Sequence, residues 1–464
     1  MERPVTEADL TFEHVPETDQ SFENALAKAR GRDRLTVDDA IELLTTGTDI
    51  PGIDRRRKEQ VLEAADRRRA DVVGEEVTFV ANLNNNVTTA CNVGCLFCNF
   101  KDAAHTFETE YAEESGPETA GFTKTPEESR EIVEDAVSRG IYEVTSVSGL
   151  HPAFALDEEH LEILETHPER KAVNYKPPER YVTDPGTYAE QLTAMSVDDV
   201  HVHSMTPEEA YHARRGTEWS YEEVYARLSE AGLDTVPGTA AEILVDEVRD
   251  VICPGKIDTA GWLEAMEAAA TVGLGLTATI MYGHVENEAH RALHLKRVRD
   301  LQERVGGAIT EFVPLSFVHQ NTPLYEHDVV SGGASTDEDE LLIAVSRLFL
   351  DNVDHIQSSW VKYGNEQGLK MLSCGADDFM GTILSEEITK RAGGEYGEFR
   401  SVTDYVELIS SIGRVPVERS TDYETRRVLD PEEPPFGPEL GPQANGTPLL
   451  TRAERSERDV LADD

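Results

Sequence analysis

Three cysteines, Cys91, Cys95 and Cys98, lie in one short run of the chain and account for three of its five cysteines. Their spacing is C-x3-C-x2-C. Thiolates gathered in a short loop bind zinc or iron–sulfur clusters, and the closed sites of both kinds take four protein ligands. Three cysteines can bind three irons of a 4Fe–4S cubane and leave the fourth iron open. The spacing therefore predicts a catalytic cluster whose open iron accepts a small molecule.

Two other interpretations of this loop remain open on the sequence. A structural zinc site would need a fourth ligand, and His105, seven residues after Cys98, is the nearest candidate. The three side chains could also pack in the core, because free cysteine is often buried. Disulfides are not expected, since the cysteine count is odd and the first residues lack the apolar run of a secretory signal.

The charge composition indicates the kind of solution in which the protein works. Asp and Glu number 90 against 43 Lys and Arg, which gives a net charge of −47, and only 11 of the basic residues are lysines. Such a surface suits the cytosol of a halophile, where about 1 M salt screens charges within about 3 Å. The charge argues against a nucleic acid partner, because phosphates would be repelled. No apolar run reaches 18 residues, so we expect a cytoplasmic protein without a membrane span.

Strand and helix patterns alternate along the middle of the chain. A capping-box pattern at Thr36 opens a short helix, and residues 55–72 continue helically. A strand over residues 77–83 leads directly into the cysteine loop. Seven further strands are predicted over residues 143–147, 172–175, 200–204, 235–237, 276–282, 311–317 and 355–360. Helices are predicted over residues 126–140, 221–231, 260–272, 289–304 and 337–350.

Eight strands in β-α alternation predict an α/β fold, a parallel (βα)8 TIM-type barrel. A doubly wound open sheet is the alternative, because alternation does not distinguish an open sheet from a closed one. We expect a flexible N-terminus over residues 1–20 and a helical extension over residues 21–75. The barrel with its C-terminal helices is expected over residues 76–427, followed by a disordered acidic tail over residues 428–464.

Polar or glycine-rich clusters follow several predicted strands, where the active sites of such barrels lie. The candidate residues are Ser148 and Gly149, His201 and His203, Glu242, the run Met281, Tyr282, Gly283 and His284, and Asn321. Each cluster also has a structural interpretation. Ser148-Gly149 could be an ordinary turn, the two histidines a packed polar layer of the barrel, and Glu242 the acidic first turn of a helix.

The cysteine loop after the first strand, with Phe97 before the last cysteine, resembles the radical S-adenosylmethionine (SAM) superfamily. The resemblance implies that Cys91, Cys95 and Cys98 bind a 4Fe–4S cluster, and that its open iron binds the methionine part of SAM. One electron would then cleave the sulfonium and give a 5′-deoxyadenosyl radical. By the same resemblance, Phe97 lies near the adenine.

The superfamily pattern extends to the ends of two later strands. The resemblance implies that the turn at Ser148 and Gly149 holds the amino group of the methionine. It also implies that Met281, Tyr282 and Gly283, at the end of the sixth strand, support the adenine. Both segments are therefore expected to bind the cofactor.

Further segments resemble one subgroup of the superfamily, which contains the futalosine enzymes of menaquinone synthesis and the two halves of the deazaflavin synthase. These segments are residues 148–152, 238–244, 282–286, 312–317, 319–325 and 375–378. Residues 237–244 and 319–325 are most similar to the tyrosine-using half. The resemblance implies a transferase of deazaflavin biosynthesis with L-tyrosine and 5-amino-6-(D-ribitylamino)uracil as substrates.

The implied reaction begins with removal of a hydrogen atom from tyrosine, followed by cleavage of its Cα–Cβ bond. A 4-hydroxybenzyl radical would then add to carbon 5 of the pyrimidine. We expect His201, His203, Glu242, His284 and Asn321 to bind the two substrates. A low-potential electron donor and the second deazaflavin synthase subunit are the expected protein partners.

Two alternative functions remain open. One is another reaction of the same subgroup, such as that of cyclic dehypoxanthinyl futalosine synthase or aminofutalosine synthase. The other is a non-catalytic iron–sulfur electron carrier, which would need a fourth protein ligand for its cluster.

Overall fold

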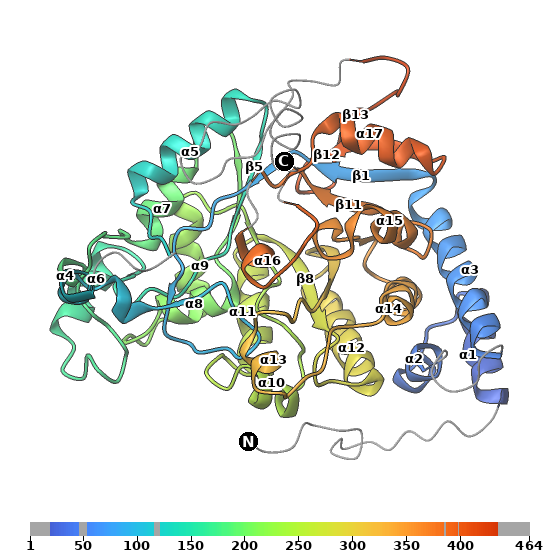
Figure 1. Cartoon of the computed structure of the whole chain (residues 1–464), viewed down its shortest axis with the longest axis horizontal. Coiled ribbons are helices and arrows are strands. Elements are labelled where there is room, and N and C mark those ends of the chain that lie inside the picture. The colour runs from blue at the N-terminus through green and yellow to red at the C-terminus, as the bar shows by residue number, and fades with distance from the viewer. Residues whose placement is uncertain (1–18, 46–52, 116–120, 385–386, 398, 435–464) are drawn as a thin grey trace, which may run out of the picture.

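The computed structural model describes residues 19–45, 53–115, 121–384, 387–397 and 399–434. Residues 1–18 of the predicted flexible N-terminus and residues 435–464 of the predicted acidic tail lie outside the described residues. Figure 1 shows strands at the centre of the molecule with helices around them. No helix in the described ranges combines the length and the apolar character that a membrane span requires.

Seven parallel strands form a curved sheet in the order β10-β9-β8-β7-β6-β5-β2. A second sheet has the order β11-β1-β12-β13, and a two-stranded sheet pairs β3 with β4. The strands are β1 (Glu76–Val80), β2 (Asn82–Asn84), β3 (Ala90–Cys91), β4 (Asp102–Ala103), β5 (Glu143–Ser146), β6 (His201–Ser204), β7 (Thr235–Val236), β8 (Gly275–Tyr282), β9 (Ile309–Ser316), β10 (His355–Ile356), β11 (Asp378–Gly381), β12 (Val415–Arg419) and β13 (Thr425–Val428).

The two larger sheets join into a ring. β1 and β2 are separated only by Ala81, so one stretch of chain belongs to both sheets. β11 pairs in parallel with β1, and its other edge meets β10. There the Asp377 N–H donates to the Ile356 carbonyl (3.0 Å) and the Ser358 N–H to the Asp378 carbonyl (2.8 Å). Eight parallel strands, with β1 and β2 counted as one, therefore surround the interior, and the predicted α/β barrel is confirmed.

The identity of one barrel strand differs from the prediction. Residues 172–175 form a turn, in which the Ala172 N–H donates to the Glu169 carbonyl (2.8 Å) and Asn174 adopts a φ of 53°. This left-handed conformation, followed by Pro177 and Pro178, does not extend a strand. β11, which begins at Asp378, supplies the missing strand.

Helices surround the ring and connect its strands, whereas the short α16 (Glu387–Arg391) lies over the centre of the molecule in this view (Figure 1). They are α1 (Asp19–Gly31), α2 (Val37–Leu44), α3 (Ile53–Val73), α4 (Thr109–Ser115), α5 (Pro126–Ser138), α6 (Glu158–Thr166), α7 (Tyr188–Met195), α8 (Pro207–Ala213), α9 (Tyr221–Glu230), α10 (Asp246–Ile252), α11 (Thr259–Thr271), α12 (Glu288–Arg304), α13 (Pro323–Glu326), α14 (Thr336–Phe349), α15 (Trp360–Met371), α16 (Glu387–Arg391) and α17 (Val402–Ser411), with 3-10 turns at η2 (Ala104–Phe107) and η3 (Pro178–Arg180).

The helical extension packs on the outside of the barrel. α2 contacts α12 and α14, and α3 lies along α14 (Figure 1). The predicted capping box at Thr36 is present: its hydroxyl accepts the Asp39 N–H, and the Asp39 carboxylate accepts the Thr36 N–H. Such a cap typically contributes about 1 kcal/mol to helix stability.

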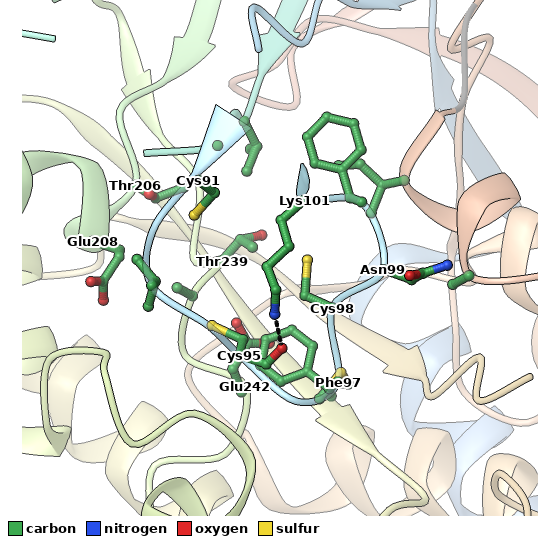
Figure 2. Close-up of a pocket in the computed structure, with 18 of the residues that line it drawn as sticks. Cys91, Cys95, Phe97, Cys98, Asn99, Lys101, Thr206, Glu208, Thr239 and Glu242 are labelled. Atoms are coloured by element: carbon green, nitrogen blue, oxygen red, sulfur yellow. Dashed lines mark hydrogen bonds between the residues drawn. The ribbon is translucent and has the colours of Figure 1, made fainter. Parts of the chain in front are cut away.

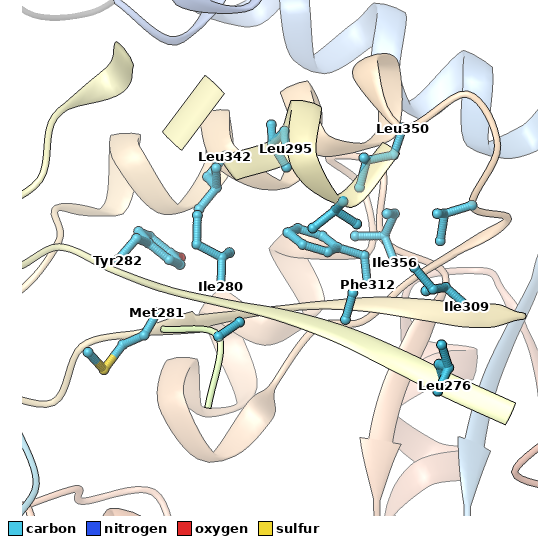
Figure 3. Close-up of a cluster of buried hydrophobic side chains, with 14 of the residues drawn as sticks. Leu276, Ile280, Met281, Tyr282, Leu295, Ile309, Phe312, Leu342, Leu350 and Ile356 are labelled. Atoms are coloured by element: carbon cyan, nitrogen blue, oxygen red, sulfur yellow. The ribbon is translucent and has the colours of Figure 1, made fainter. Parts of the chain in front are cut away.

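Side-chain alternation along β8 separates the helical layer from the barrel interior. Figure 3 shows Ile280 and Tyr282 pointing toward Leu342 of α14, while Met281 points to the opposite side of the strand. Ile280, Leu342 and Leu295 of α12 are fully buried. Burial of each such aliphatic side chain contributes about 1.5–3 kcal/mol. The residues that face the interior, such as Met281, are left to form the site.

Candidate functional site

A cavity that is partly open to solvent lies where the barrel strands end. Its walls come from the cysteine loop, the loop after β5, the start of α8, the turn after β7 and the ends of β8 and β9. Catalytic sites of parallel barrels lie at this face. The residues that line it include Cys91, Cys95, Phe97, Cys98, Lys101, Ser148, Gly149, Thr206, Glu208, Glu209, Glu242, Lys256, Met281, Phe317 and Lys362.

The cysteine loop is held at both ends and in its middle. The short strands β3 and β4 pair the residues on either side of it. Within it, the Leu96 N–H donates to the Ile252 carbonyl (2.8 Å), and the Leu96 carbonyl accepts the Leu324 N–H (3.0 Å). Gly94 has a φ of 80°, a conformation that a residue without a Cβ adopts at no steric cost. The chain can therefore reverse sharply between Cys91 and Cys95.

Figure 2 shows the loop curving around the side chain of Lys101, with the sulfur atoms of Cys91, Cys95 and Cys98 around that side chain in this view. The Lys101 ammonium donates to the Cys95 carbonyl. A cluster between the sulfur atoms would require this side chain to rotate away, which its flexible four-carbon stem permits.

The donor set fits a cluster with one open iron. Among the described residues that line the cavity, the three cysteines are the only thiols, and there is no histidine. Cys253 and Cys374 are buried and do not line it. No set of three or more histidine, cysteine or acidic residues in the described ranges is arranged to hold a single metal ion. Ligands of a cubane bind different irons and need not converge on one point.

His105 does not provide the fourth ligand that a structural zinc site would need. The ring of His105 packs edge-on against Tyr111, with 5.4 Å between the ring centres, and does not line the cavity. Burial raises the pKa of the Cys91 and Cys95 thiols. Because the thiolate is the metal ligand, a bound metal has to drive their deprotonation.

Two buried carboxyl groups form one side of the cavity at the start of α8. Glu209 accepts the Thr206 hydroxyl (2.7 Å) and the N–H groups of Thr206 (2.9 Å) and Ser148 (3.3 Å). Glu208 accepts the Ile257 N–H (3.1 Å). Burial raises the pKa of Glu208, and it raises the pKa of Glu209 to about 7. Glu209 can therefore hold a proton near neutral pH.

Several of the predicted site residues meet in this cavity. Besides the three cysteines, they are Phe97, Ser148, Gly149, Glu242 and Met281. Two of them are linked directly, because the Met281 N–H donates to the Glu242 carbonyl (2.7 Å). The cofactor and substrate roles expected for these residues stay predictions.

Three predicted residues at the end of β8 lie behind the cavity wall. The Tyr282 hydroxyl donates to Asp339 (2.7 Å), within the core. A Cβ on Gly283 would lie 2.4 Å from the Ala334 nitrogen, so this glycine allows close backbone packing. The fully buried side chain of His284 is 2.9 Å from Glu286. None of the three is among the described residues that line the cavity.

His201 and His203 also lie away from the cavity. Both rings contact the Thr235 hydroxyl, at 2.8 Å and 2.7 Å. Burial lowers the pKa of His203 to about 4, so this imidazole is neutral. Glu143, at the start of β5, faces this histidine pair, so the two histidines belong to a packed polar layer at the opposite end of the barrel. Asn321 is exposed outside the cavity.

The structure adds cavity residues that the sequence reasoning missed. Three of the 11 lysines, Lys101, Lys256 and Lys362, line the cavity of this strongly acidic protein. Glu208 and Glu209 join them. The scarcity of lysine in the sequence was the one signal that could have drawn attention to the three lysines.

Comparisons with known proteins agree with this geometry. The family model of the radical SAM superfamily matches residues 85–298. A second model, described as the CofH/MqnC C-terminal region, matches residues 306–432.

Two solved structures are similar in fold. The FeFe-hydrogenase maturase HydG from Carboxydothermus hydrogenoformans has a TM-score of 0.58 at 15% identity, over 87% of this chain and 81% of that chain. Methylornithine synthase (PylB) has a TM-score of 0.58 at 16% identity, over 84% and 97%.

Much closer relatives come from halophilic archaea. The chain is 75% identical over 439 residues to the 5-amino-6-(D-ribitylamino)uracil–L-tyrosine 4-hydroxyphenyl transferase of Haloarcula marismortui, covering 95% of this chain and 96% of the relative. It is 70% identical over 442 residues to the transferase of the same name from Halobacterium salinarum, with coverage of 95% and 96%. FO synthase of Mycobacterium leprae is 38% identical over 79% of this chain and 38% of that protein. The chain therefore belongs to the radical SAM superfamily and, within it, to the family of these hydroxyphenyl transferases.

Proposed function

We propose that this protein transfers the 4-hydroxybenzyl part of L-tyrosine to 5-amino-6-(D-ribitylamino)uracil, the two substrates in the names of its relatives. The Cα–Cβ bond of tyrosine breaks, the amino-acid part leaves as the imine dehydroglycine, and Cβ joins carbon 5 of the pyrimidine to form a deazaflavin precursor. As a radical SAM protein, the chain uses a 4Fe–4S cluster and SAM, which when bound supply the 5′-deoxyadenosyl radical.

The observation that carries this proposal is the position and lining of the cavity. The three cluster cysteines lie in one wall, at the carboxyl ends of the barrel strands, and polar side chains from other elements face the same space. A cofactor and further ligands can therefore bind side by side there. A transfer between two substrates needs this arrangement, because the reacting atoms must meet away from water.

The walls of the cavity offer two kinds of surface. Phe97, Met281 and Phe317 provide apolar surface in the same cavity as the cysteines. Polar groups come from separate elements, among them Glu208 of α8 and Lys362 of α15. We assign the contacts with the amino-acid and pyrimidine groups of the substrates to the polar side chains of the cavity, with Glu242 among them. The other predicted substrate residues, His201, His203, His284 and Asn321, are not assigned such contacts.

Two protein partners belong to the proposal. A low-potential electron donor has to reduce the cluster. The chain matches only 38% of the length of the M. leprae FO synthase, so that protein contains a long segment without a counterpart in the match. We therefore propose the second deazaflavin synthase subunit as the partner that completes the pathway step.

The test uses the anaerobically reconstituted protein with dithionite and SAM. Addition of tyrosine together with the ribitylaminouracil should give 5′-deoxyadenosine and a benzylated adduct. Omission of either substrate should remove the adduct. A Cys95→Ser variant serves as the cluster-deficient control and should form neither product. Cofactor cleavage that is indifferent to tyrosine, or turnover of a futalosine derivative in its place, would contradict the proposal.

A further inference from the structure

A buried ion pair lies in the floor of the cavity. The Lys256 ammonium is 2.6 Å from the Glu242 carboxylate, and the two side chains are 12% and 7% exposed. Burial lowers the pKa of Lys256, but the surrounding groups, with the Glu242 carboxylate first among them, raise it above its usual value. The Lys256 side chain is therefore an ammonium at neutral pH. A buried ion pair seldom improves stability over apolar packing, so its presence here calls for another explanation.

The segment that carries Lys256 supports the cysteine loop from behind. The Ile252 carbonyl accepts the Leu96 N–H (2.8 Å). A Cβ on Gly255 would lie 2.6 Å from the Val93 carbonyl oxygen, so the two backbones are in direct contact. Val93 and Leu96 flank Cys95 in the sequence. The segment is therefore fixed to the loop on both sides of this cysteine.

These contacts place the ammonium beside the same part of the loop. The Lys256 nitrogen lies 5.2 Å from the centre of the Phe97 ring, within the range of a cation–π contact. The ion pair of Lys256 and Glu242 and the cysteine loop around Cys95 therefore lie together at the cavity floor.

A fixed charge at this position has a defined effect on a bound cluster. Reduction adds one negative charge to the cluster, and a nearby cation stabilises the more negative state. Charge and hydrogen bonding around a cluster are among the factors that set its reduction potential. Because the pair is buried, salt screens it far less than a surface charge, even in a halophile.

We propose that Lys256 is a positioning residue for the cluster: its ammonium, held by Glu242, supplies a fixed positive charge at the Cys95 side and favours the reduced state. This inference requires only the 4Fe–4S cluster that members of the family bind, and it does not depend on the proposed substrates. It assigns Lys256 an electrostatic role on the iron–sulfur centre. The negative charge of Glu242 disfavours the reduced cluster, but its ion pair with Lys256 holds the ammonium in position.

The test is a redox titration of the reconstituted cluster, followed by electron paramagnetic resonance, without SAM or substrates. Lys256→Met should lower the ratio of reduced to oxidised cluster at a fixed potential about tenfold, which corresponds to a potential about 59 mV lower. Glu242→Gln should raise this ratio by a similar factor. The double variant, which has the net charge of the original pair, should lie within about threefold of the wild type.

Lys296→Met is the matched control, because it removes the same charge from a half-exposed pair with Asp300. It should change the ratio by less than about twofold. If Lys256→Met does not retain iron, Glu242→Gln, the double variant and the charge-conserving Lys256→Arg decide the question. Shifts of the same sign in both single variants, or a shift in the control as large as that of Lys256→Met, would overturn the proposal. Because no substrate is present, this result is independent of the proposed transferase activity.

Discussion

The replacement of Gly149 by alanine tests how closely the loop after β5 must approach the cysteine loop. A Cβ at this position would lie 2.6 Å from the carbonyl oxygen of Ala90 and 3.1 Å from that of Thr88. Both are backbone atoms, so no rotamer change relieves the contact. The Gly149 N–H already donates to the Thr88 carbonyl (2.8 Å), which keeps the two segments together. Because Ala90 directly precedes Cys91, the added methyl group should displace that ligand.

Overpacking of this kind typically costs 1–3 kcal/mol. A domain stability of about 5–15 kcal/mol tolerates this loss, so the variant should fold. If displacement of Cys91 relieves the strain, the same energy is lost from cluster binding, which weakens it roughly 5- to 150-fold. The assay is iron retained per protein during titration with a chelator, with the thermal midpoint measured in parallel.

Gly332→Ala provides the matched control, because a Cβ there has no atom within 4 Å and its φ lies outside the left-handed region. The control should retain iron as the wild type does. Wild-type iron retention in Gly149→Ala would refute the reasoning, since it would show that the two segments can separate without moving Cys91. A variant that loses iron together with its fold would place the strain in the barrel instead.

Three further outcomes are expected. Arg419 donates to Asp378 (2.6 Å) and Glu311 (3.3 Å) inside the barrel, so Arg419→Met should destabilise the fold by roughly 3–5 kcal/mol in denaturant unfolding, and the exposed Arg426→Met should change it far less. Burial raises the pKa of Glu311 to about 7 from its usual 4.5, so its stabilising contribution is complete below pH 4.5 and is lost as the pH rises through 7. Glu311→Gln should therefore flatten the dependence of the unfolding midpoint on pH between these values; an unchanged slope would contradict the assignment. A change from about 1 M to about 0.1 M salt should lower the thermal midpoint followed by circular dichroism, because the net charge of −47 is then screened over about 10 Å instead of about 3 Å. An equal midpoint at both concentrations would contradict this expectation.

The sequence was most informative where the relevant signal is local. The cysteine spacing, the Thr36 cap and the helices α9, α11, α12 and α14 follow from patterns within a few turns of chain, and the structure has these elements within two residues of the predicted limits. The strand predicted over residues 172–175 is wrong because a run of four residues, three of them apolar, is too short to distinguish a strand from a turn. β11 was missed because it begins with Asp378, and aspartate is uncommon in strands.

The candidate site shows a second limit of prediction from sequence, which is the position of a residue along the barrel axis. Alternation places His201 and His203 on one face of β6, but it does not show whether they lie at the bottom or at the mouth of the barrel. Their contacts with Thr235 place them at the bottom. Lys256 follows α10 without any motif, and only the contacts between its segment and the cysteine loop bring it into the cavity. Tertiary contacts of this kind leave no periodic signal in the sequence.

The central claim is that the benzylic carbon of tyrosine is transferred to the pyrimidine. The most direct measurement uses tyrosine labelled with carbon-13 at Cβ, the ribitylaminouracil and the reduced, SAM-supplied protein, followed by mass spectrometry of the product. The account predicts an adduct that is heavier by one mass unit than the adduct from unlabelled tyrosine, with the label on the carbon that joins the ring to the pyrimidine. An adduct without the label, or the absence of any tyrosine-derived adduct, would contradict it.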